Sequence, residues 1–125
     1  DPTTSVQALD SIEVLLRTAA TRRLLPGEER DESGSLRLAF PTPSWQDFLS
    51  IGLDETRLYG ADSIQITRRL RALLEDLLGS VPEFRRPAVE DQLAMLEASV
   101  ARSFIGDADQ ISAGTRDRQG IGSPR

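Results

Sequence analysis

Residues 42–78, TPSWQDFLSIGLDETRLYGADSIQITRRLRALLEDLL, decide the fold that the sequence predicts. A helix capped by Thr42 or Ser44 should end at Gly60, and the next helix should follow after a short turn and end at Gly79. Because only a few residues join the two helices, we expect them to form a central antiparallel pair. The rest of the chain is expected to pack on this pair.

The first helix of the pair carries a carboxylate on an apolar face. An advance of about 100° per residue places Glu55 among aromatic and small residues, namely Trp45, Phe48, Gly52 and Tyr59. A carboxylate buried without a partner costs several kcal/mol, so Glu55 needs an explanation. Gly52 in the middle of the same helix indicates a close approach, by a neighbouring helix or by a ligand.

Two interpretations of Glu55 stay open. In the structural one, Glu55 forms an ion pair inside the domain, with partners among Arg37, Arg68, Arg69 and Arg71. In the functional one, Glu55 faces a cleft and contacts a ligand, and the residues that would share the site are Tyr59, Trp45, Gly52 and Arg37.

The second helix of the pair has a regular apolar stripe, formed by Ile66, Leu70, Leu73, Leu74 and Leu77. Its arginines, Arg68, Arg69 and Arg71, are interpreted as a solvated face beside acidic residues rather than as a phosphate site. Four apolar residues fall outside the predicted stripes and would mark contacts with other subunits or with a parent protein, namely Leu15, Leu49, Leu53 and Met95.

Two more helices flank the central pair. The first should begin with Asp1 as its N-cap and run to about Arg22, with a stripe of Val6, Leu9, Ile12, Leu16 and Ala20. The last should follow Pro87 and run to about Phe104, with Val89, Leu93, Leu96 and Val100 on its stripe.

Residues 28–40 change character, because a turn signal at residues 32–34 precedes an alternation of apolar and other side chains. This pattern predicts a small β-hairpin. Two strands alone are marginally stable, so we expect the face of Leu36, Leu38 and Phe40 to lie on the helices. The predicted fold is mainly α: a four-helix domain over residues 1–105 with one small hairpin. Residues 106–125 would form a polar tail that packs on the domain or on a neighbour.

Composition limits the chemistry of the chain. A length of 125 residues with 38% hydrophobic side chains suits one domain with a modest core. The absence of Cys and His excludes disulfides, Cys/His zinc sites and Ser-His-Asp catalysis. A net charge of −5 argues against general binding of nucleic acid. No residue pattern indicates a cofactor, a metal site or a catalytic site.

The chain has no apolar run near the roughly 20 residues that a membrane span requires, and no signal peptide opens it. We therefore expect a soluble piece that does not insert directly into a membrane. Its start at Asp1, without an initiating Met, suggests a fragment or a processed product.

Several motifs occur here in a characteristic order: DPTTSVQALDSIE, LPGEERDESGSLRLAFPTPSWQDFL, DETRLYGADS, RRLRALLEDL and DRQGIGSP. In this order the chain resembles the C-terminal soluble part of a family of bacterial predicted membrane proteins. The resemblance covers essentially the whole chain. It implies an N-terminal block of transmembrane helices in a longer parent protein, a place at the bacterial inner membrane and a cytoplasmic domain. It implies no reaction.

Three functional hypotheses follow. The favoured one is an extramembrane helical domain of a bacterial membrane protein that serves assembly, regulation or ligand sensing, with the rest of the parent protein as its partner and a homo-oligomer as a further option. A second is a small enzyme that uses Glu55, Asp54 and Asp47 as acid/base groups or as metal ligands. A third is a free-standing helical interaction module.

Overall fold

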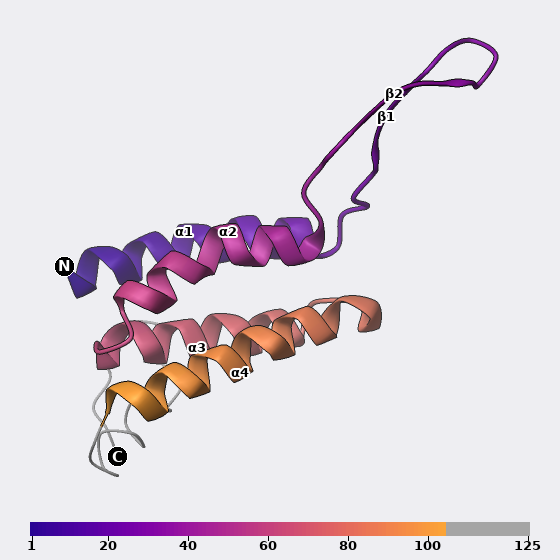
Figure 1. The fold of residues 1–125 in the computed structure, drawn as a ribbon. Coiled ribbons are helices and arrows are strands. Elements are labelled where there is room, and N and C mark those ends of the chain that lie inside the picture. Colours follow the sequence, from indigo (N-terminus) through magenta and orange to yellow (C-terminus); the bar gives the residue numbers. More distant parts are fainter. Residues whose placement is uncertain (105–125) are drawn as a thin grey trace.

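The computed structural model describes residues 1–104, which form a helical bundle with one projecting β-hairpin (Figure 1). The elements in chain order are α1 (Pro2–Ala20), β1 (Gly27–Arg30), β2 (Leu36–Phe40), α2 (Trp45–Tyr59), α3 (Ile64–Leu78), the single 3-10 turn η1 (Glu83–Arg85) and α4 (Arg86–Ser103). The predicted mainly α fold with one small hairpin is thereby confirmed. The tail predicted for residues 106–125 lies outside the described residues.

Short polar side chains begin three of the helices, as their positions in the sequence indicate. Asp1 accepts a hydrogen bond from the Thr3 N–H, and Ser63 accepts one from the Ile66 N–H. Ser44 and Asp47 form a reciprocal capping box, in which each side chain accepts a hydrogen bond from the backbone N–H of the other residue. These caps fix where the helices start.

The helices form two layers, with α1 and α2 in one and α3 and α4 in the other (Figure 1). Helix α1 packs on α3, and α2 packs on α4. Helices α2 and α3 are antiparallel and joined by a tight turn, but they lie across a diagonal of the bundle and share little contact. The expectation that this pair forms the centre is therefore wrong: α3, the most buried helix, is central through its contacts with α1 and α4.

Gly60 is required by the turn between α2 and α3. A Cβ atom there would overlap the Ile66 side chain and would lie 2.8 Å from the Thr56 carbonyl oxygen. The Gly60 N–H donates the last hydrogen bond of α2 to the same carbonyl at 2.8 Å, and the turn itself is closed by a hydrogen bond from the Ser63 N–H to the Gly60 carbonyl at 2.9 Å. Any larger residue would push the start of α3 away from the end of α2.

The core consists mainly of leucines from all four helices (Leu9, Leu16, Leu49, Leu53, Leu70, Leu73, Leu74, Leu77 and Leu96). Leu49 and Leu53 belong to this core, so the prediction that they face other subunits is wrong, whereas Leu15 and Met95 are exposed. The buried line of α2 is Trp45, Leu49 and Leu53, at a spacing of four residues. The sequence predicted a different face of α2, because Trp45 was grouped with the other aromatic residues of the helix instead of with its leucines.

Because α2 buries Trp45, Leu49 and Leu53, the Glu55 side chain is exposed. Glu55 makes no hydrogen bond or ion pair with the described part of the chain. The predicted internal ion pair of Glu55 is therefore wrong. The buried carboxylate belongs instead to Glu13, which lies on the core side of α1 between Leu9 and Leu16.

Glu13 is paired with an arginine of the neighbouring helix. Arg69 Nη1 donates a hydrogen bond to Glu13 Oε1 at 3.1 Å, and Arg69 Nε donates to Asp10 Oδ1 at 2.9 Å. The Arg69 side chain is only 4% exposed. Arg68 is also buried and Arg71 is half-buried, with Arg71 paired to Glu97 of α4. The interpretation of these arginines as a solvated face was wrong, because α3 has helices on two sides.

We predict that Glu13→Gln destabilises the domain by about 3 kcal/mol, because Arg69 would keep a buried charge with only the exposed Asp10 as an ionic partner. Glu55→Gln is the matched control, since it removes the same charge from an exposed site and should change stability by less than about 0.5 kcal/mol. Urea unfolding followed by circular dichroism measures both. Equal effects of the two variants would contradict the assignment of Glu13 as the structural carboxylate.

Candidate functional site

The residues predicted to share a ligand site lie in separate parts of the structure. Trp45 and Tyr59 stand at opposite ends of α2, fourteen residues apart, which corresponds to about 20 Å along a helix. Arg37 lies on β2, where its Nε donates a hydrogen bond to Asp31 Oδ2 at 2.9 Å. Gly52 faces α1, since a Cβ there would lie 3.3 Å from Ile12 Cγ2. The close neighbour of Gly52 is thus a helix.

Glu55 and Tyr59 do share one shallow pocket of about 410 Å³, formed where the start of α1 meets the turn between α2 and α3. Asp1, Ser5 and Asp62 also line it. The pocket is open, and Tyr59 is 82% exposed. Among residues 1–104, no group of three or more acidic side chains is arranged to hold a metal ion.

The other carboxylates considered for catalysis have structural partners. Asp47 completes the capping box of α2. Asp54 Oδ1 accepts hydrogen bonds from Gln92 Nε2 at 3.1 Å and from Arg57 Nη2 at 3.3 Å, which ties α2 to α4. These contacts account for the positions of both side chains without a substrate or a metal.

The most unusual feature is the hairpin, which projects from one end of the bundle as an arm (Figure 1). Leu36, Leu38 and Phe40, which were predicted to form one face, are 50%, 55% and 44% exposed. The prediction that this face lies on the helices is therefore wrong. Pro26, Pro41 and Pro43 in the connecting segments favour extended backbone and leave the strands pointing away from the bundle.

Phe40 is held flat against the opposite strand near the base of the arm. The strands pair antiparallel, with Gly27 opposite Phe40 and Glu29 opposite Leu38. A Cβ at Gly27 would lie 2.6 Å from the Phe40 ring. Glycine at this position is what allows the ring to cover the strand.

The tip of the arm, which we define as residues 31–35, is held by the carboxylate of Asp31. Asp31 Oδ1 accepts hydrogen bonds from the Ser33 hydroxyl at 2.6 Å and from the N–H groups of Ser33 and Ser35, both at 3.0 Å. Gly34 has a φ of 86°, in the left-handed region that glycine adopts without strain. The side-chain hydrogen bond from Ser33, the backbone hydrogen bond from Ser35 and the Arg37 guanidinium lower the pKa of Asp31.

We predict that the tip loses order as the pH falls below about 4, the usual pKa range of an aspartate. The sign follows from the lowered pKa of Asp31: its stabilising contribution is complete above the unfolded-state pKa and is lost as the pH falls through the folded-state pKa. Amide chemical shifts of Ser33 and Ser35, followed by NMR between pH 7 and 2, would show this transition. In Asp31→Asn the transition should be absent; a transition that survives in this variant would assign it to another group.

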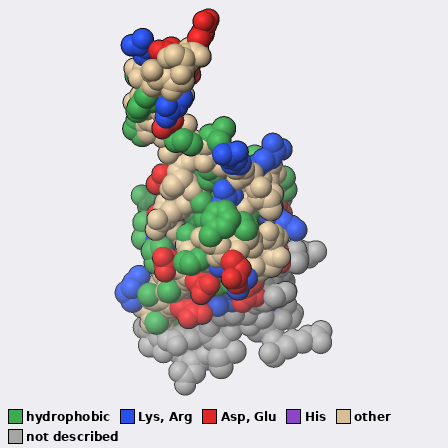
Figure 2. Space-filling view, turned by 90° about the vertical axis from the view of Figure 1, so that its right-hand side faces the viewer, with side chains coloured by type: hydrophobic (Ala, Val, Ile, Leu, Met, Phe, Trp, Pro, Cys, Tyr) green, Lys and Arg blue, Asp and Glu red, His purple; other side chains and the backbone are tan. Residues whose placement is uncertain are grey.

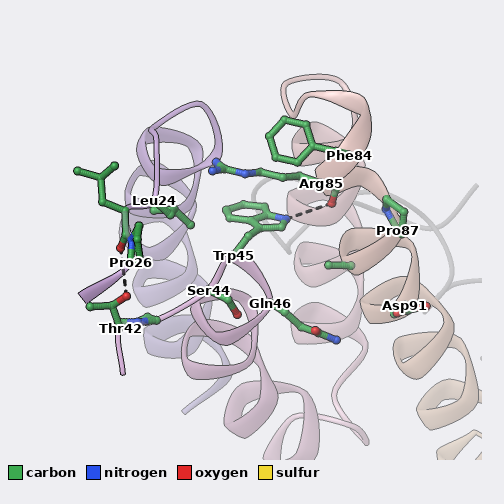
Figure 3. Close-up of a pocket in the computed structure, with 13 residues that line it drawn as sticks. Leu24, Pro26, Thr42, Ser44, Trp45, Gln46, Phe84, Arg85, Pro87 and Asp91 are labelled. Atoms are coloured by element: carbon green, nitrogen blue, oxygen red, sulfur yellow. Dashed lines mark hydrogen bonds between the residues drawn. The ribbon is translucent and has the colours of Figure 1, made fainter. Parts of the chain in front are cut away.

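A cleft of about 630 Å³ opens at the base of the arm (Figure 3). It lies between the connecting segments of the arm, the first turn of α2, and the start of η1 and α4. Its lining is mostly apolar and includes Leu24, Leu25, Pro26, Trp45, Phe84, Pro87 and Ala88. This size is within the usual range of ligand and side-chain binding pockets.

Arg85 organises the wall of the cleft. Its Nη1 donates hydrogen bonds to the carbonyl oxygens of Ala19 at 2.8 Å and Ala20 at 2.6 Å, and its Nη2 donates to that of Arg22 at 2.7 Å. Ala19 and Ala20 end α1 and Arg22 lies just beyond it, so these carbonyls are at the negative end of the helix dipole. The Ala19 carbonyl also accepts a hydrogen bond from the Arg22 N–H at 3.1 Å. The buried guanidinium thus caps α1 from a distant part of the chain.

Trp45 and Arg85 hold each other in place (Figure 3). The guanidinium of Arg85 lies 5.6 Å from the centre of the Trp45 ring and 5.3 Å from that of Phe84. The Trp45 indole N–H donates a hydrogen bond to the Arg85 carbonyl at 3.1 Å. Trp45 was a predicted site residue, whereas Arg85 was missed, because the run Phe84-Arg85-Arg86-Pro87 does not distinguish its two arginines.

Figure 2 faces this end of the molecule: apolar side chains lie in the middle of the bundle, with basic side chains above them and acidic ones below. Arg22 and Arg23 are exposed beside Phe84 in a neighbouring hollow, and neither side chain has an ion-pair partner among the described residues. Phe84 is 76% exposed and Leu25 is 61% exposed. An apolar cleft with unpaired arginines in the adjoining hollow suits an apolar segment that carries acidic residues.

We predict that Arg85→Met destabilises the domain by about 3 kcal/mol, because three carbonyls at the end of α1 lose a charged donor. Arg23→Met is the matched control and should have little effect on stability. Trp45 is the only tryptophan of the chain, so its fluorescence reports on the cleft directly. We expect the emission of Arg85→Met to shift in the folded state; an unchanged spectrum and an unchanged unfolding midpoint would contradict this role.

The described residues define a class of protein: a four-helix bundle with a projecting hairpin arm and an apolar cleft at the base of that arm. The chain belongs to the family described as "Predicted membrane protein (DUF2254)", which matches residues 1–76. No helix within residues 1–104 has the length and apolar character to cross a bilayer.

The chain is similar to uncharacterised proteins of Mycobacterium tuberculosis and Mycobacterium bovis, with 29% identity over 111 residues in each case. The aligned segment covers 88% of this chain and 21% of each relative, so the chain spans about a fifth of the length of the curated relatives it matches. No solved structure matches it. These matches support the expected membrane-protein family; the position of the chain at the C-terminal end of a parent protein stays a prediction.

Proposed function

We propose that this chain is an extramembrane assembly domain of a larger bacterial membrane protein and that the arm is its binding element. The observation that carries the proposal is the set of exposed apolar side chains on the arm, Leu36, Leu38 and Phe40. Membership of a family of predicted membrane proteins supports the context, as does the match to much longer relatives. The proposal includes the inner membrane as the site of the parent protein and its cytoplasmic side as the location of this domain.

The energetics suit a contact that forms on assembly. Covering the exposed half of each of the three side chains would contribute about 1 kcal/mol per residue. The hydrogen bonds of Asp31 fix the tip before any partner binds, and the Phe40 ring is fixed against Gly27. A pre-ordered binding element loses less entropy when it binds, so more of the contact energy appears as affinity.

The other hypotheses rest on weaker features. A ligand-sensing role would use the open pocket of Glu55 and Tyr59, and it stays a prediction. Catalysis by Asp47 and Asp54 has less support, because both carboxylates are engaged in structural contacts. A free-standing interaction module would use the same arm and differs only in the absence of a membrane-bound parent.

We predict that Leu38→Ser in the full-length parent protein weakens its assembly, because it removes the central apolar side chain of the arm without touching the bundle. Ala39→Ser on the opposite face of β2 is the matched control. Native electrophoresis of the detergent-solubilised protein measures the assembled fraction, which should fall at least threefold for Leu38→Ser only. Equal assembly of both variants and the wild type would refute the proposed function of the arm.

A further inference from the structure

We propose that the arm of one chain docks in the cleft of a second copy, so that two chains exchange arms about a two-fold axis. This inference rests on the proposed function and adds the identity of the partner. It is carried by the match between two features of the same molecule, the arm and the cleft, in apolar surface, charge and position.

The apolar surfaces correspond in kind. Side chains alternate along a strand, so Leu38 and Phe40 share one face of the arm, opposite Glu29 and Gly27. A register shift between Glu29 and Arg30 interrupts the alternation before Leu36, which is exposed nearer the tip. The cleft presents leucine, proline and aromatic side chains, with Phe84 exposed at its edge. Its volume of about 630 Å³ is large enough for several such side chains.

The unpaired charges are also complementary. Glu28 and Asp31 of the arm have arginine partners within the hairpin, whereas Glu29 and Glu32 have no partner among the described residues. Glu29 lies opposite Leu38 and therefore on the apolar face. A hollow beside the cleft, which shares Leu24, Phe84 and Arg85 with it, carries two unpaired arginines, Arg22 and Arg23. These arginines would meet the carboxylates of the arm in a second copy, and the acidic residue that lines the cleft itself, Asp91, lies on the α4 side.

The position of the cleft fits a symmetric exchange. The segments that connect the arm to the bundle line the cleft, through Leu25, Pro26, Thr42 and Pro43. An arm arriving from a second copy would therefore lie beside the base of the first arm, and the same contact would form twice. Such a self-complementary arrangement is the commonest symmetry of soluble dimers.

The charges also favour a protein partner over a lipid surface. Anionic headgroups attract basic segments, whereas the arm carries four carboxylates at residues 28, 29, 31 and 32 against two arginines, Arg30 and Arg37. A membrane remains an outcome of the test below.

The test uses the absence of native cysteines. Leu38→Cys is introduced into one chain and Phe84→Cys into a second chain that carries a mass tag, and the two are mixed under mild oxidation. Only a contact between chains yields the mixed disulfide-linked dimer. We expect it to form at least tenfold faster than with Ala39→Cys, which places the thiol on the opposite face of the same strand. Circular dichroism of each variant first establishes that the helices are intact.

Charge reversal gives a second measurement that does not depend on a disulfide. Glu29→Arg and Arg23→Glu should each shift sedimentation equilibrium of the 125-residue chain toward monomer, at least tenfold in dissociation constant. A double variant that carries both Glu29→Arg and Arg23→Glu should dimerise again. In this variant the positive charge lies on the arm and the negative charge lies beside the cleft, so the two charges attract each other as in the wild type.

Three results would overturn the inference. The first is a monomeric wild-type chain at high concentration with no cross-link above that of Ala39→Cys. The second is a disulfide within one chain when Leu38→Cys and Phe84→Cys are combined. The third is binding of the wild type to anionic phospholipid vesicles that Leu38→Ser abolishes. If the chain is monomeric while Leu38→Ser still weakens assembly of the parent protein, the arm binds another part of the parent: the proposed function stands and arm exchange fails.

Discussion

The guanidinium of Arg85 is the contact on which the binding end of this molecule depends. It lies buried between the last turn of α1 and the first residue of α2, and it donates hydrogen bonds to three carbonyls of α1 or just beyond it. A cation at this position satisfies acceptors that the helix itself leaves open. Because the connecting segments of the arm begin where α1 ends and finish where α2 starts, Arg85 fixes both ends of the arm relative to the bundle.

Much of the bundle could be predicted from local patterns. The leucine stripe of α3 and the caps Asp1, Ser44 and Ser63 are local features, and local chemistry is enough to place a helix start or a buried face when the apolar residues are regular. Helix α2 was harder, because Trp45 belongs to two possible stripes, one of aromatic residues and one of leucines. The three-dimensional packing selected the leucine stripe, which turned Glu55 to solvent.

The charged contacts show what a single sequence leaves open. A carboxylate on an apolar stripe needs a partner, and this requirement, which was applied to Glu55, holds for Glu13. The spacing of Glu13 from Leu9 and Leu16 in the sequence already places it on the apolar stripe of α1. The identity of its partner depends on which helices are neighbours, and α1 meets α3 rather than packing on a central pair. The cleft was unpredictable for the same reason, since Arg85 and Ala20 are 65 residues apart in the chain.

The base of the arm is closed by one hydrogen bond, in which the Thr42 hydroxyl donates to the Leu25 carbonyl at 3.1 Å. The chain thus returns to nearly the same place after leaving the bundle for the length of the hairpin. A bundle in which a short loop joined α1 to α2 would keep the same core, so the arm has the geometry of an insertion. Its sequence and length can therefore diverge among related proteins under different constraints from those on the helices, and partner choice can change while the scaffold stays constant.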